Sequence, residues 1–392
     1  MYIKRVITPN LKDAARQFSV IAILGPRQSG KTTLARQVFS KHKYVSLEDY
    51  NVRELANADP KRFLSDYPTK HGIILDEIQH APQLLSYIQT IVDEEKKKGF
   101  FILTGSQNFL VSQAITQTLA GRIAIITLLP LSIAEIEQAK LLSHKIEHAV
   151  FTGSYPALYA EKIAVSRLYQ SYTTTYLERD VRQIKNIVDL NLFKKFISLC
   201  AGRTGQIIKF SSLGNDCGVD DKTVKAWLSL LEASYIIFFL QPYYKNFGKR
   251  LIKSPKLYFV DTGLACSLLR IKSADELLDH SMRGPLIETF IVSDLLKQQY
   301  NLEMLPSLYF WRDHAGNEID CLIDEGKKVV PIEIKSSKTV IASYFKEINY
   351  WKSFANQTGS DSYVIYGGTE NQKWPAGKVV SWRSAGDLIK KL

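Results

Sequence analysis

A glycine-rich stretch near the N-terminus places the strongest constraint on the fold of this chain. GPRQSGKTT, from Gly25 to Thr33, follows the apolar run VIAIL and leads directly into the helical pattern TTLARQVF. A short apolar run of this kind is typical of a buried strand in a parallel sheet. Glycines let backbone amides curl around a phosphate, and the start of the next helix adds its partial positive charge. The sequence therefore predicts an α/β domain in which a strand, a phosphate-binding loop (P-loop) and a helix follow one another.

The residues of this loop have distinct expected roles. Lys31 is expected to reach the β and γ phosphates of a nucleotide, and the Thr32 hydroxyl is expected to hold Mg²⁺. The remaining residues are expected to surround the phosphates, and they are Gly25, Pro26, Arg27, Gln28, Ser29, Gly30 and Thr33. The pattern thus predicts ATP and Mg²⁺ as cofactors, with Lys31 also acting in hydrolysis.

Two acids follow the next apolar run, GIIL, which ends at Leu75. An acid at this position lies at the carboxyl edge of a parallel sheet, where nucleotide sites are found. Asp76 is expected to orient the Mg²⁺ ion, and Glu77 to polarise the attacking water. An acidic pair after a strand can also be a plain helix cap. The P-loop upstream favours the catalytic interpretation.

Two further segments leave alternatives open. Residues 104–108, TGSQN, follow a third apolar run and either sense the γ-phosphate or form an ordinary loop capped by Ser106. Arg122, in LAGR, is either an arginine finger or a surface arginine. As a finger it would reach a nucleotide in its own chain or in a neighbouring subunit.

Several segments resemble the AAA+ ATPase domain of a prokaryotic family of predicted ATPases that carry an uncharacterised C-terminal region. They are GPRQSGKTTLARQV, GIILDEIQ, FILTGSQ, LAGR and LLPLSIAE. The resemblance continues through YLERDV, FVDTGLA, GPLIETF and EIDCLID…PIEIKSS, so it covers nearly the whole chain. It implies ATP binding and is compatible with a homo-oligomer, a hexamer or a dimer. It implies no biological role.

The segment between residues 193 and 255 predicts three helices followed by two strands around a basic turn. This is the element order of a winged helix-turn-helix. The helix from Thr223 would enter the major groove of DNA, with Lys222 and Lys225 at its exposed start. The presumed wing carries Tyr243, Tyr244, Lys245, Lys249, Arg250 and Lys253. Such modules also serve in packing or in protein interaction, so DNA contact is one of two interpretations.

A second set of candidate catalytic residues lies in the last third of the chain. Glu333 and Lys335 share one face of a predicted strand, 329–335, and Asp320 lies on the neighbouring strand, 318–323. With Glu288 on a helix upstream, they resemble the core of PD-(D/E)XK nucleases. The resemblance implies that Asp320, Glu333 and Glu288 hold Mg²⁺ and that Lys335 stabilises charge on the water or phosphate. Such a site can also persist for binding alone.

Composition limits the class of partner. The chain has 392 residues, a net charge of +12 and a pI near 9.3, which favours a polyanion, DNA first. Its four cysteines are scattered without a CxxC pair, which fits a reducing compartment. Its longest apolar patches are shorter than a membrane span. We therefore expect a cytoplasmic protein without a membrane partner.

These patterns predict four units. Residues 1–150 form the AAA+ P-loop ATPase domain, 151–190 a helical extension, 191–260 the winged helix, and 261–392 the PD-(D/E)XK-like α/β domain. The predicted function is ATP hydrolysis coupled to action on duplex or branched DNA, with a Mg²⁺-dependent nuclease site at the C-terminus. The alternative is a nucleotide-controlled protein-interaction switch with a non-catalytic nuclease-like scaffold.

Overall fold

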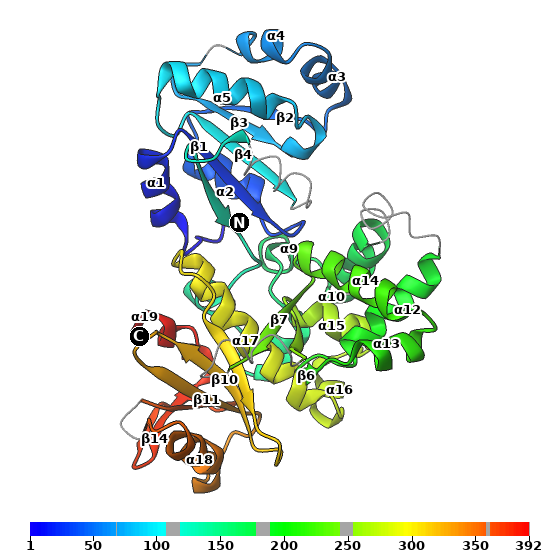
Figure 1. Cartoon of the computed structure of the whole chain (residues 1–392), viewed down its shortest axis with the longest axis vertical. Coiled ribbons are helices and arrows are strands. Elements are labelled where there is room, and N and C mark those ends of the chain that lie inside the picture. The colour runs from blue at the N-terminus through cyan, green and yellow to red at the C-terminus, as the bar shows by residue number, and fades with distance from the viewer. Residues whose placement is uncertain (68, 107–117, 178–188, 244–253, 358–360, 392) are drawn as a thin grey trace.

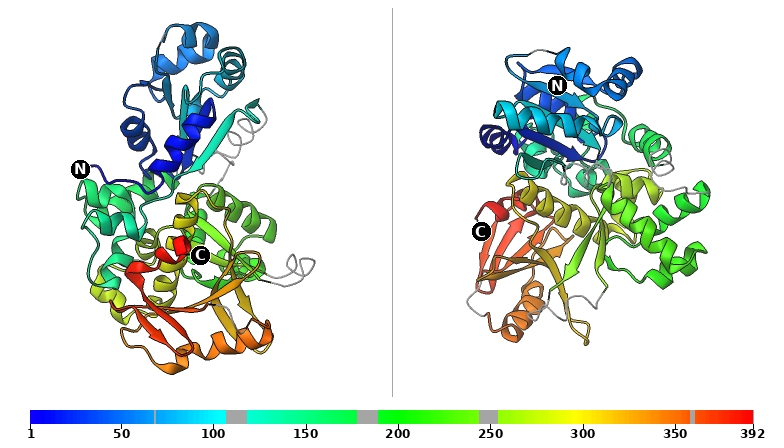
Figure 2. Two further views of the ribbon diagram at one scale, coloured as in Figure 1. Left: turned by 90° about the vertical axis from the view of Figure 1, so that its left-hand side faces the viewer. Right: turned by 45° about the horizontal axis from the view of Figure 1, so that its top comes forward.

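Two sheets organise the chain. The computed structural model describes residues 1–392 except 68, 107–117, 178–188, 244–253, 358–360 and 392. A five-stranded sheet has the order β2-β3-β4-β1-β5, and a nine-stranded sheet has the order β13-β14-β12-β11-β10-β9-β7-β8-β6. Figures 1 and 2 show the first sheet and its helices at one end of an elongated molecule, and the rest of the chain at the other end.

The five-stranded sheet is parallel throughout. Its strands are β1 (Val20–Gly25), β2 (Lys43–Ser46), β3 (Ile73–Asp76), β4 (Phe101–Ser106) and β5 (Ile123–Thr127). Alternate residues of β1 enter two different cores, Val20, Ala22 and Leu24 on one face, and Ile21 and Ile23 on the other. Both faces are therefore covered, as the continuous apolar run predicts. The helices of this region are α1 (Thr8–Gln17), α2 (Lys31–Val38), α3 (Tyr50–Ala58), α4 (Pro60–Ser65), η1 (Ile78–His80) and α5 (Leu84–Glu95).

A largely helical region follows, drawn in green in Figure 1. It contains α7 (Ile133–Gln138), α8 (Ile146–Thr152), α9 (Pro156–Ala160), α10 (Val165–Tyr172), η2 (Thr173–Leu177), α12 (Leu190–Ala201), β6 (Gln206–Ile207), α13 (Phe210–Cys217), α14 (Asp221–Ala233), β7 (Ile237–Pro242) and β8 (Lys256–Phe259). Strands β6 and β7 both pair antiparallel with β8. The helices and strands expected between residues 193 and 255 are therefore present. The basic residues of the presumed wing, Lys245, Lys249, Arg250 and Lys253, lie outside the described residues.

The C-terminal region surrounds one long helix, α17 (Arg283–Asn301), which is buried along most of its length. Its other elements are α15 (Thr262–Leu268), α16 (Ala274–Asp279), β9 (Leu308–Arg312), β10 (Glu318–Asp324), β11 (Val329–Lys335), η4 (Ala342–Phe345), α18 (Lys346–Phe354), β12 (Tyr363–Tyr366), β13 (Gln372–Trp374), β14 (Gly377–Ser381), η5 (Trp382–Ser384) and α19 (Asp387–Lys391). The predicted strand 329–335 coincides with β11.

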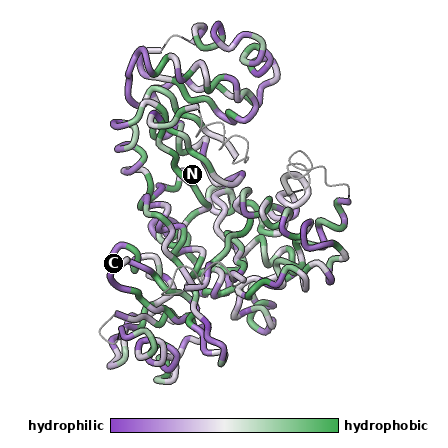
Figure 3. The backbone as a smooth tube through the Cα atoms, viewed as in Figure 1, coloured by the Kyte–Doolittle hydropathy of each residue, from purple (hydrophilic) through white to green (hydrophobic). Residues whose placement is uncertain are grey.

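The nine-stranded sheet crosses the boundary that the sequence predicts near residue 260. Strand β7 pairs in parallel with β9, with Gln241 opposite Tyr309 and Pro242 opposite Phe310. The presumed winged helix and the C-terminal strands therefore share one continuous sheet. Figure 3 shows apolar residues along the strands and polar residues on the outer helices of both regions. Within the described ranges, α17 and every other helix is too short or too polar for a bilayer crossing.

Candidate functional sites

Two glycines shape the P-loop between β1 and α2. Gly30 has φ of 92°, in the left-handed region that a side chain adopts only under strain. Gly25 packs against the backbone of Leu128, and a Cβ atom at this position would lie 2.2 Å from its carbonyl oxygen. The loop therefore takes the tight course predicted from the sequence, and α2 begins at Lys31 with its amide groups facing the loop.

Lys31 lies inside the loop rather than on the surface, since its residue is only 5% exposed. Its Nζ donates to the carbonyl oxygens of Pro26 at 2.8 Å and of Gly25 at 3.2 Å. Burial lowers the pKa of Lys31 to about 8, although the nearby carboxylates of Glu77 and Asp76 act in the opposite direction. The ammonium is thus held inside the loop by two backbone carbonyl oxygens.

Asp76 joins three strands at the carboxyl edge of the sheet. The Thr32 hydroxyl donates to Oδ1 of Asp76 at 2.8 Å, and the Tyr44 hydroxyl of β2 donates to Oδ2 at 2.8 Å. The Thr104 hydroxyl of β4 donates to Oδ1 as well. Burial, and then the hydrogen bond to Asp76, raise the pKa of Tyr44 to about 12. A hydroxyl and a carboxylate side by side form an oxygen donor set that fits Mg²⁺. Sequence analysis missed Tyr44.

Glu77 follows Asp76 with φ of 57°, so the backbone turns sharply out of β3. Its Oε2 accepts hydrogen bonds from the side-chain amide of Gln79 and, at 3.4 Å, from the backbone N–H of Ser106. Gln79 also donates to Oγ of Ser106 at 3.2 Å. Gln79 and the end of β4 therefore orient Glu77. Gln79 was not singled out from the sequence, and Gln107 and Asn108 lie outside the described residues.

A buried arginine is hydrogen-bonded to the backbone of the loop. Arg5 donates to the carbonyl oxygens of Ser29 at 2.8 Å and Leu129 at 2.7 Å, and its Nε lies 3.0 Å from Oε1 of Glu135. Glu135 is fully buried and also forms a capping box with Ser132 at the start of α7. No motif marks Arg5, because its partners lie 24 to 130 positions away.

Arg122 lies at the opposite edge of the sheet from the P-loop. It precedes β5, and its carbonyl oxygen accepts from the N–H of Val20, at the start of β1. Along β1, five residue steps of about 3.3 Å each lead from Val20 to Gly25. The backbone of Arg122 is therefore roughly 16 Å from the start of the P-loop. Its guanidinium pairs with Asp93 at 2.5 Å and 2.8 Å. Arg122 is therefore engaged with Asp93 at the end of the sheet away from the P-loop, and a role in its own chain stays a prediction. A role in a neighbouring subunit stays a prediction as well.

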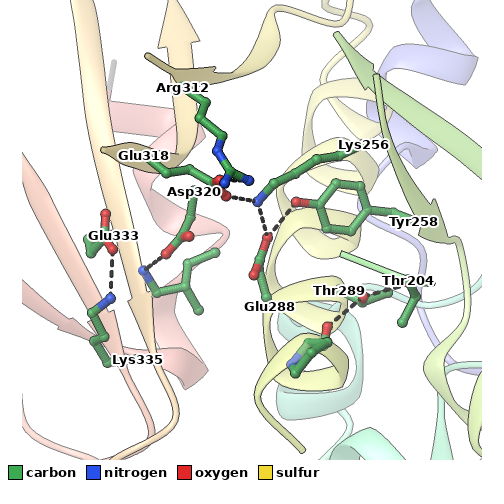
Figure 4. Close-up of polar contacts among 12 residues, drawn as sticks. Thr204, Lys256, Tyr258, Glu288, Thr289, Arg312, Glu318, Asp320, Glu333 and Lys335 are labelled. Carbon is green, nitrogen blue, oxygen red and sulfur yellow. Dashed lines mark hydrogen bonds and ion pairs between the residues drawn. The ribbon is translucent and has the colours of Figure 1, made fainter. Parts of the chain in front are cut away.

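The structure brings the predicted C-terminal site residues into one region, shown in Figure 4. Lys335 lies 2.6 Å from Oε1 of Glu333, both on β11. Asp320, on β10, accepts from the backbone N–H of Ile334 at 2.8 Å. Burial, and then the neighbouring Asp320, raise the pKa of Glu288 to about 7 and that of Glu333 well above its usual range.

A lysine from outside this region enters the cluster. Lys256, at the start of β8, lies 2.9 Å from Oε1 of Glu288 and 2.5 Å from Oε1 of Glu318. Tyr258 donates to the same Oε1 of Glu288 at 2.5 Å. Sequence analysis missed Lys256, Tyr258 and Glu318.

Two of the three acids predicted to hold a C-terminal Mg²⁺ are ion-paired with lysines. Among the described residues, no three His, Cys, Asp or Glu side chains are arranged to hold a metal ion. Glu288, Asp320 and Glu333 are near one another, but Glu288 is paired with Lys256 and Glu333 with Lys335. That these three acids hold Mg²⁺ therefore stays a prediction.

Comparison with protein families divides the chain into three matched stretches. An AAA domain family matches residues 17–137. Two families described as domains of unknown function, DUF8612 and DUF4143, match residues 143–275 and 283–384. The AAA match agrees with the P-loop geometry, so the predictions of an AAA-type domain and of an ATPase are confirmed. The C-terminal family carries no assigned activity.

The chain is similar to other proteins and to solved structures, but these similarities do not identify its biological role. An uncharacterised protein of Mycobacterium tuberculosis is 28% identical over 342 residues, covering 86% of this chain and 74% of the relative. An uncharacterised protein of Methanocaldococcus jannaschii is 26% identical over 350 residues, covering 81% and 75%. The Walker-type ATPase of Pyrococcus abyssi is 17% identical with a TM-score of 0.46, covering 68% of this chain and 95% of that structure.

Proposed function

We propose that this ATPase couples ATP hydrolysis to action on duplex or branched DNA. The observation that carries the proposal is the placement of Lys222 and Lys225, both exposed at the start of α14. The opposite side of this helix is buried through Val224, Trp227, Leu228 and Leu231. The lysines thus project from a helix whose position is fixed by packing. Exposed lysines on a rigid helix are suited to contact with DNA phosphates.

The surrounding elements support a winged-helix interpretation. Helices α12, α13 and α14 precede β7 and β8, and the strands β7, β8 and β6, in that order, form one end of the nine-stranded sheet. The side chain of Asp220 caps α14 by accepting from the N–H of Thr223, which fixes where the helix begins. Phe193 and Phe196 of α12 pack edge-on against Trp227. The net charge of +12 favours the same class of partner.

Hydrolysis is assigned to the residues around the P-loop. We propose that Lys31 binds the β and γ phosphates, that Thr32 and Asp76 hold Mg²⁺, and that Glu77 orients the attacking water. When bound, Mg²⁺ neutralises charge on the phosphate oxygens. Gln79 and Ser106 hold Glu77 in place, and Arg5 stabilises the loop. Arg122 is the candidate arginine from a neighbouring subunit, in a dimer or a hexamer.

The C-terminal region is proposed to have a PD-(D/E)XK-like fold. Helix α17, strands β9 to β11, helix α18 and strand β12 follow in the order that the sequence predicts. Glu288, Asp320, Glu333 and Lys335 come from this helix and from two adjacent strands. The fold accounts for their positions, whereas cleavage of DNA requires in addition a bound metal ion.

Salt-dependent DNA binding tests the proposal. Fluorescence anisotropy of a labelled duplex would give the affinity between about 50 and 200 mM salt, a range over which several phosphate contacts produce a steep fall. Replacing Lys222 and Lys225 together by Gln is expected to reduce the slope of log affinity against log salt by about 2. The matched control replaces Lys97 and Lys98, both exposed on the ATPase domain. An equal slope in the wild type and both variants would contradict the assignment of α14 to DNA.

A second function is favoured by one observation. The ion pair between Lys256 and Glu288 occupies the C-terminal cluster, as expected of a scaffold rather than a nuclease. In this alternative the protein is a nucleotide-controlled switch that binds another protein. This alternative predicts that DNA does not change the rate of ATP hydrolysis. The first function predicts that DNA raises this rate.

A further inference from the structure

The ammonium of Lys256 lies at the centre of an acidic cluster. Two strands of the nine-stranded sheet and the helix α17 contribute its residues. Lys256 comes from β8, Glu288 from α17 and Glu318 from β10. Figure 4 shows the lysine reaching across to both carboxylates, with Asp320 beside them. The residue is 2% exposed. A lysine so deeply buried is rare in proteins and requires charged or polar partners around its head.

The partners of this ammonium are well matched to it. Its Nζ lies 2.9 Å from Oε1 of Glu288 and 2.5 Å from Oε1 of Glu318, and 5.7 Å from the centre of the Phe310 ring. Glu318 is further paired with Arg312 at 3.3 Å. One cation therefore bridges two carboxylates, as a divalent ion does in a metal site.

One carboxylate oxygen of each acid is engaged by a protein donor, whereas Oε2 of Glu333 is buried without a hydrogen-bond partner. Oε1 of Glu288 accepts from both Lys256 and Tyr258, and Oδ2 of Asp320 accepts from the N–H of Ile334. Oε1 of Glu333 is paired with Lys335. A Mg²⁺ ion requires near-octahedral oxygen ligands at about 2.0 to 2.1 Å, and two ammonium groups nearby would repel it.

We infer that the Lys256 ammonium takes the place of a divalent cation in this cluster. It neutralises Glu288 and Glu318 and holds α17 and β10 against β8. While it remains there, the cluster does not bind Mg²⁺ or Mn²⁺. The inference is independent of the proposed action on DNA, since it concerns only what occupies the cluster.

A Mn²⁺ titration of the full chain, with the metal alone and no nucleotide, tests this inference. Calorimetry or the electron paramagnetic resonance signal of free Mn²⁺ would give the isotherm. The wild type is expected to show no saturable binding that depends on Glu288. Lys256→Met should bind Mn²⁺ at least tenfold more tightly, and the double variant Lys256→Met/Glu288→Gln should lose that gain. Lys272→Met, at an exposed lysine, is the matched control and should resemble the wild type.

A thermal measurement covers the case in which Lys256→Met is unstable. Removing the ammonium leaves Glu288 without its cation, whereas Glu318 keeps Arg312, so the Tm of Lys256→Met should fall. Mn²⁺ should raise that Tm but not the Tm of the wild type. If Lys256→Met folds and binds no more Mn²⁺ than the wild type, the ammonium does not exclude the metal and the inference fails. Stoichiometric Mn²⁺ binding by the wild type that Glu288→Gln abolishes would overturn it, whatever the other variants do.

Discussion

The hydroxyl of Thr32 donates a 2.8 Å hydrogen bond to Oδ1 of Asp76, although the two residues are 44 positions apart in the sequence. The bond joins the start of α2 to the end of β3, so the two predicted Mg²⁺ ligands already lie side by side. An oxygen pair fixed by the fold requires little rearrangement when a metal–nucleotide complex binds.

Replacing Asp76 tests this pairing. Asp76→Asn keeps the shape of the side chain but removes its charge, so we expect ATP hydrolysis to fall by about 100-fold. Steady-state phosphate release over a Mg²⁺ series would measure it. Asp66→Asn, at an exposed acid of the same domain, is the control. Unchanged hydrolysis by Asp76→Asn would remove Asp76 from the site.

The pKa of Lys31 predicts how nucleotide affinity changes with pH. Burial lowers it to about 8, so the free protein loses this positive charge as the pH rises through 8. ATP binding requires the charged form, so above the pKa the affinity should fall by up to about tenfold per pH unit. Below pH 7 the contribution should be constant. Titration with a fluorescent ATP analogue between pH 6.5 and 9.5 tests this.

Lys31→Ala should lose nucleotide binding and hydrolysis at every pH. Lys31→Arg retains a positive charge throughout this range, so any binding that it keeps should not show the fall above pH 8. The same pH dependence in Lys31→Arg would assign the titration to another group.

Arg5 is expected to stabilise the ATPase domain as well as the loop. Arg5→Met leaves the buried Glu135 without its cation, which should lower the free energy of unfolding by about 3 to 5 kcal/mol. Chemical denaturation would measure the loss. The double variant Arg5→Met/Glu135→Gln should recover part of it, because no buried charge is then unpaired. If both variants are equally destabilised, the ion pair is not the cause.

Gln79 is expected to act by positioning Glu77. Gln79→Ala should lower kcat by about tenfold and leave KM nearly unchanged, because Gln79 touches the carboxylate of Glu77 and not the P-loop. Glu77→Gln should bind ATP and fail to hydrolyse it. A comparable change in KM for Gln79→Ala would indicate a role in nucleotide binding instead.

The sequence predicts the parts of the fold that depend on local pattern. The apolar run before the P-loop, the acids at the end of β3 and the strand 329–335 all lie where spacing and alternation place them. Tyr44, Arg5 and Lys256 were missed for a common reason. Each acquires its role from a partner more than 20 positions away, and no short pattern marks such a partner.

The pairing of β7 with β9 was missed for a related reason. Only two residue pairs join these strands, and they connect segments more than 60 positions apart, so neither strand carries a signal of its neighbour. The sequence predicts a domain boundary near residue 260. The structure instead extends one sheet across it, which brings Lys256 to the C-terminal acids.

The most direct measurement of the central claim is steady-state ATP hydrolysis by the purified full chain, with and without single-stranded, duplex and branched DNA at low salt. Glu77→Gln serves as the inactive control. The proposed function predicts that duplex or branched DNA raises the rate several-fold and that Lys222→Gln/Lys225→Gln loses most of this rise. A rate that none of the DNA forms changes, in a preparation that hydrolyses ATP through Glu77, would contradict coupling to DNA and favour the protein-interaction switch.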